Sequence, residues 1–243
     1  MSADYRRSHL SPDYGQLYHA EFSSNPYRRM VWQLEQGILD HILTTFYRNS
    51  EIDHLDFACG TGRILSYFED RTSKAVGVDL SPSMLEVARK HNKIAEIYEA
   101  DLTRGDVLGS RKFNLITAFR FFPNAEADLR MEAMEVLARH LEDNGYLVFN
   151  NHMNMGSTRN RLARLIGRRG CKGMSIAEVK ALLAENHLEI VKVFHLCVFP
   201  ASERHMLLPQ PFLRYIEGFL ARIPVLCNLG ENLVFVCRRA HTG

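Results

Sequence analysis

A short glycine-containing loop between two apolar segments constrains the fold of this 243-residue chain more than any other feature. The loop runs from Asp56 to Gly62 and reads D-F-A-C-G-T-G. It lies between a strand-like run that ends at Phe57 and a helix-like run that starts near Ile64. Because glycine lacks a Cβ, the backbone at Gly60 and Gly62 can adopt unusual torsion angles and approach a ligand closely. The loop therefore predicts a binding site between a strand and a helix.

Two further acids follow the next strand-like runs. Asp79 closes the run Ala75–Val78, and Asp101 follows a third strand-like segment. Ligands of open α/β sheets bind outside the carboxyl ends of the strands, so these acids are expected at one edge of a sheet. Asp79 lies 17 positions after Gly62, near the spacing at which an acid accepts hydrogen bonds from ribose hydroxyls. Leu65 stands where a dinucleotide fingerprint needs its third glycine, and no Lys-Ser or Lys-Thr follows for a P-loop.

Strand-like and helix-like segments alternate along the rest of the chain. The strand-like runs fall near 52–57, 74–79, 94–99, 113–119, 145–150, 188–199 and 232–237. The helical patterns fall near 62–70, 81–92, 124–142, 175–187 and 211–223. This alternation predicts right-handed βαβ units, a largely parallel sheet and an α/β fold class.

The first 47 residues form a separate, aromatic-rich segment. Pro26 marks the expected start of a helix that continues to about Phe46, with apolar residues at helical spacing. We expect residues 1–47 to form a helical cap over the ligand edge of the sheet. Within this cap, Tyr14 and Tyr18 lie four positions apart and so share one face of a helix. They could close over a cationic ligand, or they could simply pack the cap onto the body.

Five segments in order resemble the motifs of class I S-adenosylmethionine (SAM)-dependent methyltransferases. They are Leu55–Arg63, Val76–Leu85, Glu99–Leu102, Phe113–Arg120 and Gly145–Asn150. The first is similar to the family's usual L-D-x-G-C-G-T-G, with Ala58 in place of the first glycine. In the fourth, Asn114 stands where Asp is usual. As an ordered and correctly spaced set these motifs are specific, whereas any one alone would be weak.

The resemblance implies one domain over residues 1–243, with the cap at 1–47 and a Rossmann-like core at 48–243. The core is expected to hold a seven-stranded, mostly parallel sheet with helices on both faces, ending in an antiparallel hairpin. The implied cofactor is SAM, which is converted to S-adenosylhomocysteine (SAH). By the resemblance, Asp79 holds the ribose hydroxyls, Met84 packs on the adenine face, and Asp101 receives the adenine amino group. The full expected cofactor set is Tyr14, Tyr18, Asp56, Ala58, Cys59, Gly60, Gly62, Asp79, Leu80, Met84, Asp101, Leu102 and Phe119.

Residues that contact the methyl acceptor are expected at the ends of the fourth and fifth strands. SAM carries an activated methyl group, so such an enzyme must mainly align the acceptor and exclude water. A base is needed for a hydroxyl acceptor, whereas an unprotonated amine needs little help. His152 is the best single candidate for the base because histidine titrates near neutral pH, and the alternative is a solvated histidine just beyond a strand. Arg120 could clamp an anionic acceptor or pair with a nearby carboxylate.

The composition describes a globular chain with no strong global charge. Apolar residues make up 46% of the chain, charged residues 24%, and the net charge is +2. This balance gives no global attraction to nucleic acid or to an anionic membrane, so a nucleic-acid partner is not expected. No apolar run approaches the ~20 residues that span a membrane. The five cysteines are odd in number and form no C-x-x-C pair, so we expect a reducing, cytoplasmic location. No metal site is expected because acids and histidines lack recognisable ligand spacing.

One local segment departs from this balance. No acid occurs between Asn144 and Ala177, and the basic residues there are Arg159, Arg161, Arg164, Arg168, Arg169 and Lys172. We expect an insertion at about 153–172 on the substrate side of the fold, with arginines on one helical face and apolar residues on another. It could recruit an anionic substrate, or it could be a solvated surface.

The sequence therefore predicts a SAM-dependent methyltransferase that acts on O or N of a small-molecule acceptor, with an anionic acceptor as one form of this prediction. Two alternatives stay open. One is a methyltransferase of RNA or protein, and the other is a non-catalytic SAM-binding module, because fold alone does not determine function. The oligomeric state is left as monomer or homodimer.

Overall fold

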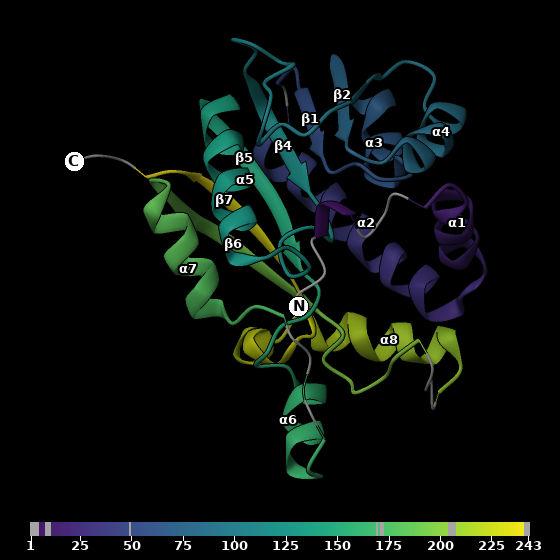
Figure 1. The fold of residues 1–243 in the computed structure, drawn as a ribbon. Coiled ribbons are helices and arrows are strands. Elements are labelled where there is room, and N and C mark those ends of the chain that lie inside the picture. Colours follow the sequence, from purple (N-terminus) through teal and green to yellow (C-terminus); the bar gives the residue numbers. More distant parts are fainter. Residues whose placement is uncertain are drawn as a thin grey trace.

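The computed structural model describes residues 5–7, 11–48, 50–168, 170, 173–203 and 208–240 of the chain. Its centre is a seven-stranded sheet in the order β3-β2-β1-β4-β5-β7-β6 (Figure 1). The strands are β1 (Asp53–Phe57), β2 (Lys74–Asp79), β3 (Glu96–Glu99), β4 (Phe113–Ala118), β5 (Leu141–Asn151), β6 (Leu188–Leu196) and β7 (Asn232–Arg239). Strands β1 to β5 pair in parallel, and β7 is antiparallel to both of its neighbours. The predicted Rossmann-like, mostly parallel sheet is confirmed.

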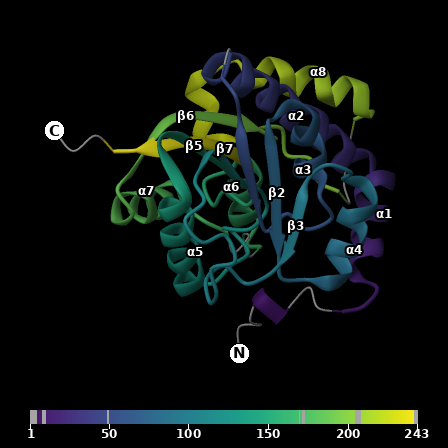
Figure 2. The ribbon, with the colours of Figure 1, turned by 90° about the horizontal axis from the view of Figure 1, so that it is seen from above.

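Helices cover both faces of the sheet, as Figure 2 shows from above. They are α1 (Tyr14–Ser24), α2 (Pro26–Phe46), α3 (Arg63–Phe68), α4 (Pro82–His91), α5 (Ala127–His140), α6 (Thr158–Leu165), α7 (Ile176–Glu185) and α8 (Gln210–Leu220). Three short 3₁₀ turns are η1 (Tyr5–Arg7), η2 (Glu69–Arg71) and η3 (Pro224–Leu229). Helices α5 and α7 pack on one face, where Leu137 and Leu183 join a core with Ile116 and Phe149. Helices α2 and α3 pack on the other face of the sheet. Leu115, the residue before Ile116 in β4, belongs to the core on that face.

The helix boundaries follow local capping chemistry. Asn25 accepts hydrogen bonds from the amides of Tyr27 and Arg28, and Pro26 occupies the first turn of α2, so the helix starts where the sequence predicts. Ser81 caps α4 in the same way. Ser175 and Glu178 form a reciprocal capping box at the start of α7. These caps explain why the starts of these helices can be predicted from the sequence.

The N-terminal helices lie partly at the ligand edge and partly over the sheet. Helix α1 crosses α4 so closely that a Cβ at Gly15 would lie 2.1 Å from the carbonyl oxygen of Ser83 (Figure 2). The second half of α2 buries Ile38, Leu39 and Ile42 against the sheet. Arg28, in the first turn of α2, lines the cavity at the carboxyl ends of the strands.

Strand β5 is longer than the segment 145–150 that the sequence indicates. It begins at Leu141, which pairs with Phe113, and a register shift follows before Leu115 pairs with Tyr146. The bulge accommodates the polar residues 142–144, which interrupt the apolar pattern and hide the start of the strand. Among the described residues, no helix combines the length and hydropathy that crossing a bilayer would require.

Candidate functional site

A cavity of about 530 Å³ opens at the carboxyl ends of β1, β2 and β4. Of the residues predicted to bind a cofactor, all line this cavity except Gly62, and Arg120 lines it as well. The elements that contribute are the glycine loop after β1, the turn after β2, the segment after β3, the segment after β4 and helix α1. Residues far apart in sequence thus converge on one volume, which lies within the usual range of about 300–1,000 Å³ for small-molecule sites.

The glycine loop is held open by unusual backbone angles. Gly60 has φ 56° and Gly62 has φ 77°, and Ala58 adopts φ 53°, a region that favours glycine. A Cβ at Gly60 would meet no atom within 4 Å, so this side of the loop faces open space. A Cβ at Gly62 would lie 2.3 Å from Asn92 Nδ2, so Gly62 allows α3 to approach α4 rather than contacting a ligand.

Asp79 fixes the loop from the end of β2. Its Oδ2 accepts a hydrogen bond from the Gly60 amide and its Oδ1 accepts one from the Ser81 amide, both at 2.8 Å. The carboxylate thus ties the glycine loop to the turn that starts α4.

Asp56 is a buried carboxyl group in the wall of the cavity. Its Oδ1 accepts a 2.7 Å hydrogen bond from the Thr117 hydroxyl, while its buried Oδ2 has no partner among the described residues. Burial raises the pKa of Asp56 to about 7, and the Thr117 hydrogen bond and the Arg63 charge oppose this shift. The adjacent His54 is also buried, which lowers its pKa to about 3, so its imidazole is neutral.

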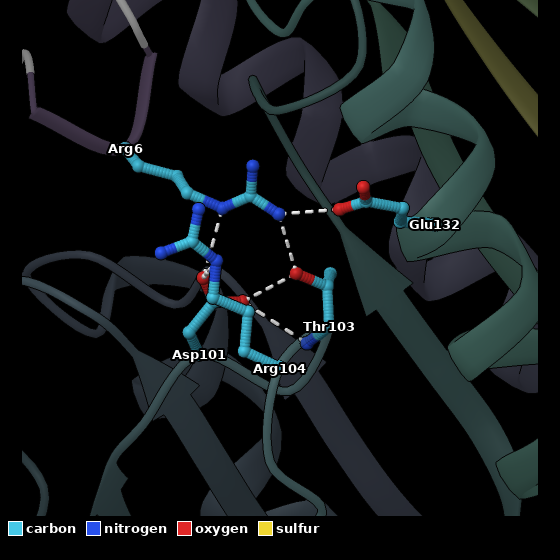
Figure 3. Close-up of polar contacts among 5 residues, drawn as sticks. All are labelled: Arg6, Asp101, Thr103, Arg104 and Glu132. Carbon is cyan, nitrogen blue, oxygen red and sulfur yellow. Dashed lines mark hydrogen bonds and ion pairs between the residues drawn. The ribbon is translucent and has the colours of Figure 1, made fainter.

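Asp101 is engaged by the N-terminal turn η1, as Figure 3 shows. Arg6 donates to Asp101 Oδ2 at 2.8 Å, to Thr103 Oγ1 at 2.6 Å and to Glu132. The Asp101 Oδ1 accepts hydrogen bonds from the amide and hydroxyl of Thr103. Burial opposes ionisation of Asp101, but these hydrogen bonds and the Arg6 charge outweigh it and lower its pKa. Neither the presence of Arg6 here nor its link to Asp101, 95 positions later, was foreseen from sequence.

Tyr5 is the second anchor of this turn. Its amide donates to Glu126 Oε1 at 3.0 Å, and its ring packs edge-on against Phe121 with the centroids 5.6 Å apart. Both Tyr5 and Arg6 line the cavity. Turn η1 therefore forms part of the cavity wall at the ends of β3 and β4.

Aromatic and cationic side chains meet in and next to the cavity. The rings of Tyr14 and Tyr18 stack with centroids 6.0 Å apart, and Tyr18 contacts Phe22 at 5.2 Å. Three guanidinium carbons surround the Phe22 ring, at 4.8 Å for Arg63, 5.1 Å for Arg28 and 5.3 Å for Arg120. We call Phe22 and these three arginines the arginine cluster. Arg28 pairs with Glu21 and Glu203, and Arg63 pairs with Glu35.

Arg120 differs from the other two arginines of the cluster. Its guanidinium has no ion-pair partner within the described part of the chain, although it lines the cavity. Its backbone is fixed: φ is 62°, the amide donates to Asn150 Oδ1 at 2.6 Å, and the carbonyl accepts from Asn124. The sequence left two roles open for Arg120, a clamp for an anionic acceptor and a partner for a nearby carboxylate. The described part of the structure contains no carboxylate partner for it.

A buried polar network behind the cluster was missed in the sequence. Glu35 on α2 is only 2% exposed and accepts hydrogen bonds from Arg63 at 2.9 Å, Asn150 at 3.3 Å and Asn232 at 2.9 Å. It therefore joins helix α2 to the start of α3 and to strands β5 and β7. A signal was present, because Glu35 lies one position from the apolar stripe of α2, but periodicity does not reveal a charged partner.

His152 does not line the cavity, in contrast to Arg120. Its Nδ1 is buried and has no hydrogen-bond partner among the described residues. Burial, together with the positive charges of Arg120 and Arg63, lowers the pKa of His152 well below its usual range. The imidazole is therefore neutral and lies in the electrostatic field of the arginine cluster.

The basic segment also lies away from the cavity. None of its described residues lines the cavity, and α6 projects from the body of the molecule in Figure 1. Arg159 pairs with Glu231, and Arg161 donates to the Gly156 carbonyl at 2.9 Å. The other two basic residues of this segment, Arg169 and Lys172, lie outside the described residues.

A second cavity of about 470 Å³ adjoins the first and shares Thr61 and Arg63 with it. Its lining includes Arg29 and Arg71 and no Asp or Glu. Among the described residues, no group of His, Cys, Asp and Glu side chains is arranged to hold a metal ion.

Residues 55–145 match the family model described as a methyltransferase domain. The chain is 30% identical over 141 residues to dTDP-4-amino-2,3,4,6-tetradeoxy-D-glucose N,N-dimethyltransferase of Saccharopolyspora spinosa, covering 57% of this chain and 54% of that protein. It is 33% identical over 96 residues to dTDP-3-amino-3,6-dideoxy-alpha-D-glucopyranose N,N-dimethyltransferase of Streptomyces fradiae, covering 39% of this chain and 37% of that protein. The chain thus matches about half, or less, of the length of these relatives.

Solved structures share the fold across nearly the whole chain. Magnesium protoporphyrin IX methyltransferase from Synechocystis, with bound SAH, has a TM-score of 0.67 at 12% identity and covers 97% of this chain and 98% of its own. An N-methyltransferase from Bradyrhizobium japonicum in complex with SAH has a TM-score of 0.58 at 14% identity, with 97% and 96% covered. Residues 55–145 thus match a methyltransferase domain, and the chain as a whole has the fold of these SAH-bound methyltransferases, with its cavity at the carboxyl ends of the strands.

Proposed function

We propose that this protein transfers a methyl group from SAM to an amine nitrogen of a small molecule that carries an anionic group. The observation that carries this proposal is the arrangement of one cavity, in which the glycine loop and its acids adjoin the arginine cluster. The loop is suited to a nucleoside-containing cofactor, and the cluster is suited to an anionic acceptor.

The residues of the cavity fit SAM in their donor and acceptor chemistry. A Cβ added at Gly60 would have no neighbouring atom within 4 Å, so this face of the loop leaves room for close approach of a ligand. Asp79, at the end of β2, would accept from the ribose hydroxyls, and Met84 and Leu102 would form apolar walls for the adenine. When bound, SAM supplies a methyl group on a positively charged sulfur, activated for transfer. Tyr14 and Tyr18 line the same cavity and could stabilise that positive charge with their ring faces.

The arginine cluster supports an anionic acceptor. Arg120 has no ion pair among the described residues, so its charge is available to a phosphate or carboxylate. The adjoining second cavity has no acidic lining residue, which favours the same ligand charge. The two relatives named above act, by their names, on dTDP-linked amino sugars, which combine a diphosphate with an amine. A nucleotide-linked amino sugar is therefore the first acceptor to test.

An amine acceptor also fits the electrostatics better than a hydroxyl. The positive charge of Arg120, which is not compensated by a described carboxylate, disfavours a second cation nearby and would favour the unprotonated, nucleophilic form of an amine. A hydroxyl would need a base within hydrogen-bond reach. His152 remains our candidate base, but it lies outside the lining of the cavity. We therefore expect His152→Gln to lower kcat for an amine by less than about tenfold, whereas loss of an essential base costs about 100-fold or more.

The test is methyl transfer by the purified full chain, with labelled SAM and a panel of nucleotide-linked amino sugars and their hydroxy analogues. We expect transfer to amines only. Arg120→Gln should raise KM for the acceptor by about tenfold to 100-fold, the loss expected for a charged hydrogen bond, and leave the Kd for SAM unchanged. Arg48→Gln, an exposed change outside the cavity, is the matched control. Transfer to hydroxy analogues alone, or an unchanged KM in Arg120→Gln, would refute the amine or the anion assignment respectively.

A further inference from the structure

Exposed large apolar side chains concentrate in two parts of the surface. Among the described residues, eleven such side chains are exposed, and seven of them lie in the segments 162–166 and 212–225. These two segments form only a small part of the chain, so the concentration is not the scatter expected of single exposed apolar residues. Neither segment lines the cofactor cavity, so the proposed methyl transfer does not explain them.

Helix α8 carries an exposed aromatic stripe. Phe212, Tyr215 and Phe219 recur at positions i, i+3 and i+7 and are 55%, 76% and 61% exposed. The opposite side of α8 is already satisfied, because Leu213 is fully buried in a cluster with Met30 of α2. Glu217 is buried too, and it accepts hydrogen bonds from backbone amides after β6. The aromatic stripe is therefore the outer, unpartnered face of a helix that is firmly packed on its inner face.

Helix α6 starts next to the turn that follows α8. It projects from the body of the molecule in Figure 1, and its C-terminal end carries Leu165 and Ile166, which are 81% and 67% exposed. Two hydrogen bonds join the base of α6 to the turn that follows α8: Thr158 Oγ1 donates to the Leu229 carbonyl at 3.3 Å, and Asn154 donates to the Asn228 carbonyl at 3.0 Å. The same turn, η3, carries the exposed Val225. We call the exposed residues of α6, α8 and η3 the α6–α8 face.

The charge of the α6–α8 face has one sign. Arg161, Arg164 and Arg168 are exposed on or next to α6, and Arg214 and Arg222 are exposed on or next to α8. No acid occurs between residues 144 and 177, and the one acid between residues 208 and 228 is the buried Glu217. Within the described residues of these segments, the face therefore presents arginine and apolar groups with no exposed carboxylate.

We propose that the α6–α8 face docks on the surface of an anionic lipid bilayer. Aromatic and aliphatic side chains flanked by arginines are the composition of segments that enter the lipid headgroup region. Negatively charged headgroups complement the arginines, at about 1 kcal/mol per residue near the surface. A second copy of this chain would instead bring arginines against arginines in a symmetric contact, with no exposed carboxylate to pair them.

The test is co-sedimentation of the full chain with vesicles of phosphatidylcholine alone and of phosphatidylcholine mixed with phosphatidylglycerol. We expect binding to the mixed vesicles that weakens as salt is added. Replacement of Arg168 and Arg222 by Gln should weaken binding about fivefold for each arginine, the equivalent of about 1 kcal/mol. The triple change Phe212→Ser, Tyr215→Ser and Phe219→Ser should weaken it by about tenfold or more. These side chains are exposed, so the variants should keep the wild-type circular dichroism spectrum and Kd for SAM.

The matched control is Leu17→Ser combined with Ile94→Ser, two exposed apolar residues outside the face, and it should bind vesicles like the wild type. No binding to the mixed vesicles overturns the proposal. Equal binding to phosphatidylcholine alone also overturns it, since the arginines would then contribute nothing. Dimerisation in sedimentation velocity that the triple aromatic variant abolishes, without vesicle binding, would instead identify the face as a contact between copies. Because Kd for SAM and methyl transfer are measured separately, failure here leaves the proposed function untouched.

Discussion

The buried carboxylate of Glu35 offers the sharpest test of how the cap is joined to the site. The change Glu35→Ala removes the acceptor for Arg63, Asn150 and Asn232. Asn150 and Asn232 are almost fully buried, so their amide groups would lose a partner that water cannot easily replace. Arg63 is more accessible, with 18% of its side chain exposed, and can be partly rehydrated.

The expected size of the effect follows from these contacts. Removal of one partner from a buried ion pair costs about 3–5 kcal/mol, because the remaining charge is left uncompensated. Partial hydration of Arg63 places Glu35→Ala near the lower end, at about 3 kcal/mol. The double change with Arg63→Ala should cost less than the sum of the two single changes, because the uncompensated guanidinium is then also removed.

Urea unfolding followed by circular dichroism measures this free energy. The matched control is Glu86→Ala, whose carboxylate pairs with Lys90 on the exposed face of α4 and should produce no measurable change. A loss below about 1 kcal/mol for Glu35→Ala would refute the reasoning, since it would place the network in water rather than in the interior. Additive single and double variants would show that Glu35 and Arg63 do not interact.

Three further changes test the glycine loop and its acids. Ala58→Gly should stabilise the protein by about 0.5–1 kcal/mol, because glycine adopts the left-handed backbone at φ 53° without strain. Thermal unfolding should therefore show a higher Tm, and a lower Tm would mean that Ala58 is unstrained. Asp79→Ala should weaken SAM binding by about 1–3 kcal/mol in calorimetry, and unchanged affinity would contradict the ribose assignment. The pKa of Asp56 is about 7 in the folded protein and about 4 in the unfolded chain, so the folded state holds the proton more tightly. The contribution of Asp56 to stability is therefore full below about pH 4 and is lost as pH rises towards 7. Relative to Asp56→Asn, the wild type should therefore lose up to about 1.4 kcal/mol per pH unit across this window in urea unfolding, and parallel curves for the two proteins would contradict the raised pKa.

Local signals predicted most of the secondary structure. The apolar runs around Asp56 and Asp79 end at the residues where β1 and β2 end, because turn-forming residues follow directly. Helix α2 starts at Pro26 because Asn25 caps it, and both residues are visible in the sequence. The convergence of the three acids on one cavity also followed from the sequence, since parallel strands place their carboxyl ends together.

Long-range polar contacts were not predictable from the sequence. Arg6 reaches Asp101 across 95 positions, and Glu35 reaches Asn232 across 197, and neither pair has a spacing rule. The position of His152 outside the cavity lining depends on how the chain turns after β5, which no local pattern records. The sequence found the arginines of α6, but only the fold revealed that they project away from the cavity.

The contacts of Arg6 have a consequence for the rate at which a ligand exchanges. Any movement of η1 away from the ends of β3 and β4 must break the hydrogen bonds from Arg6 to Asp101 and Thr103 together. If ligands pass this edge, opening becomes a unimolecular step that precedes association. The observed association rate in stopped-flow fluorescence would then reach a plateau as ligand concentration rises, and Arg6→Ala would lift that plateau. Turnover could thus be limited by the departure of SAH rather than by methyl transfer itself.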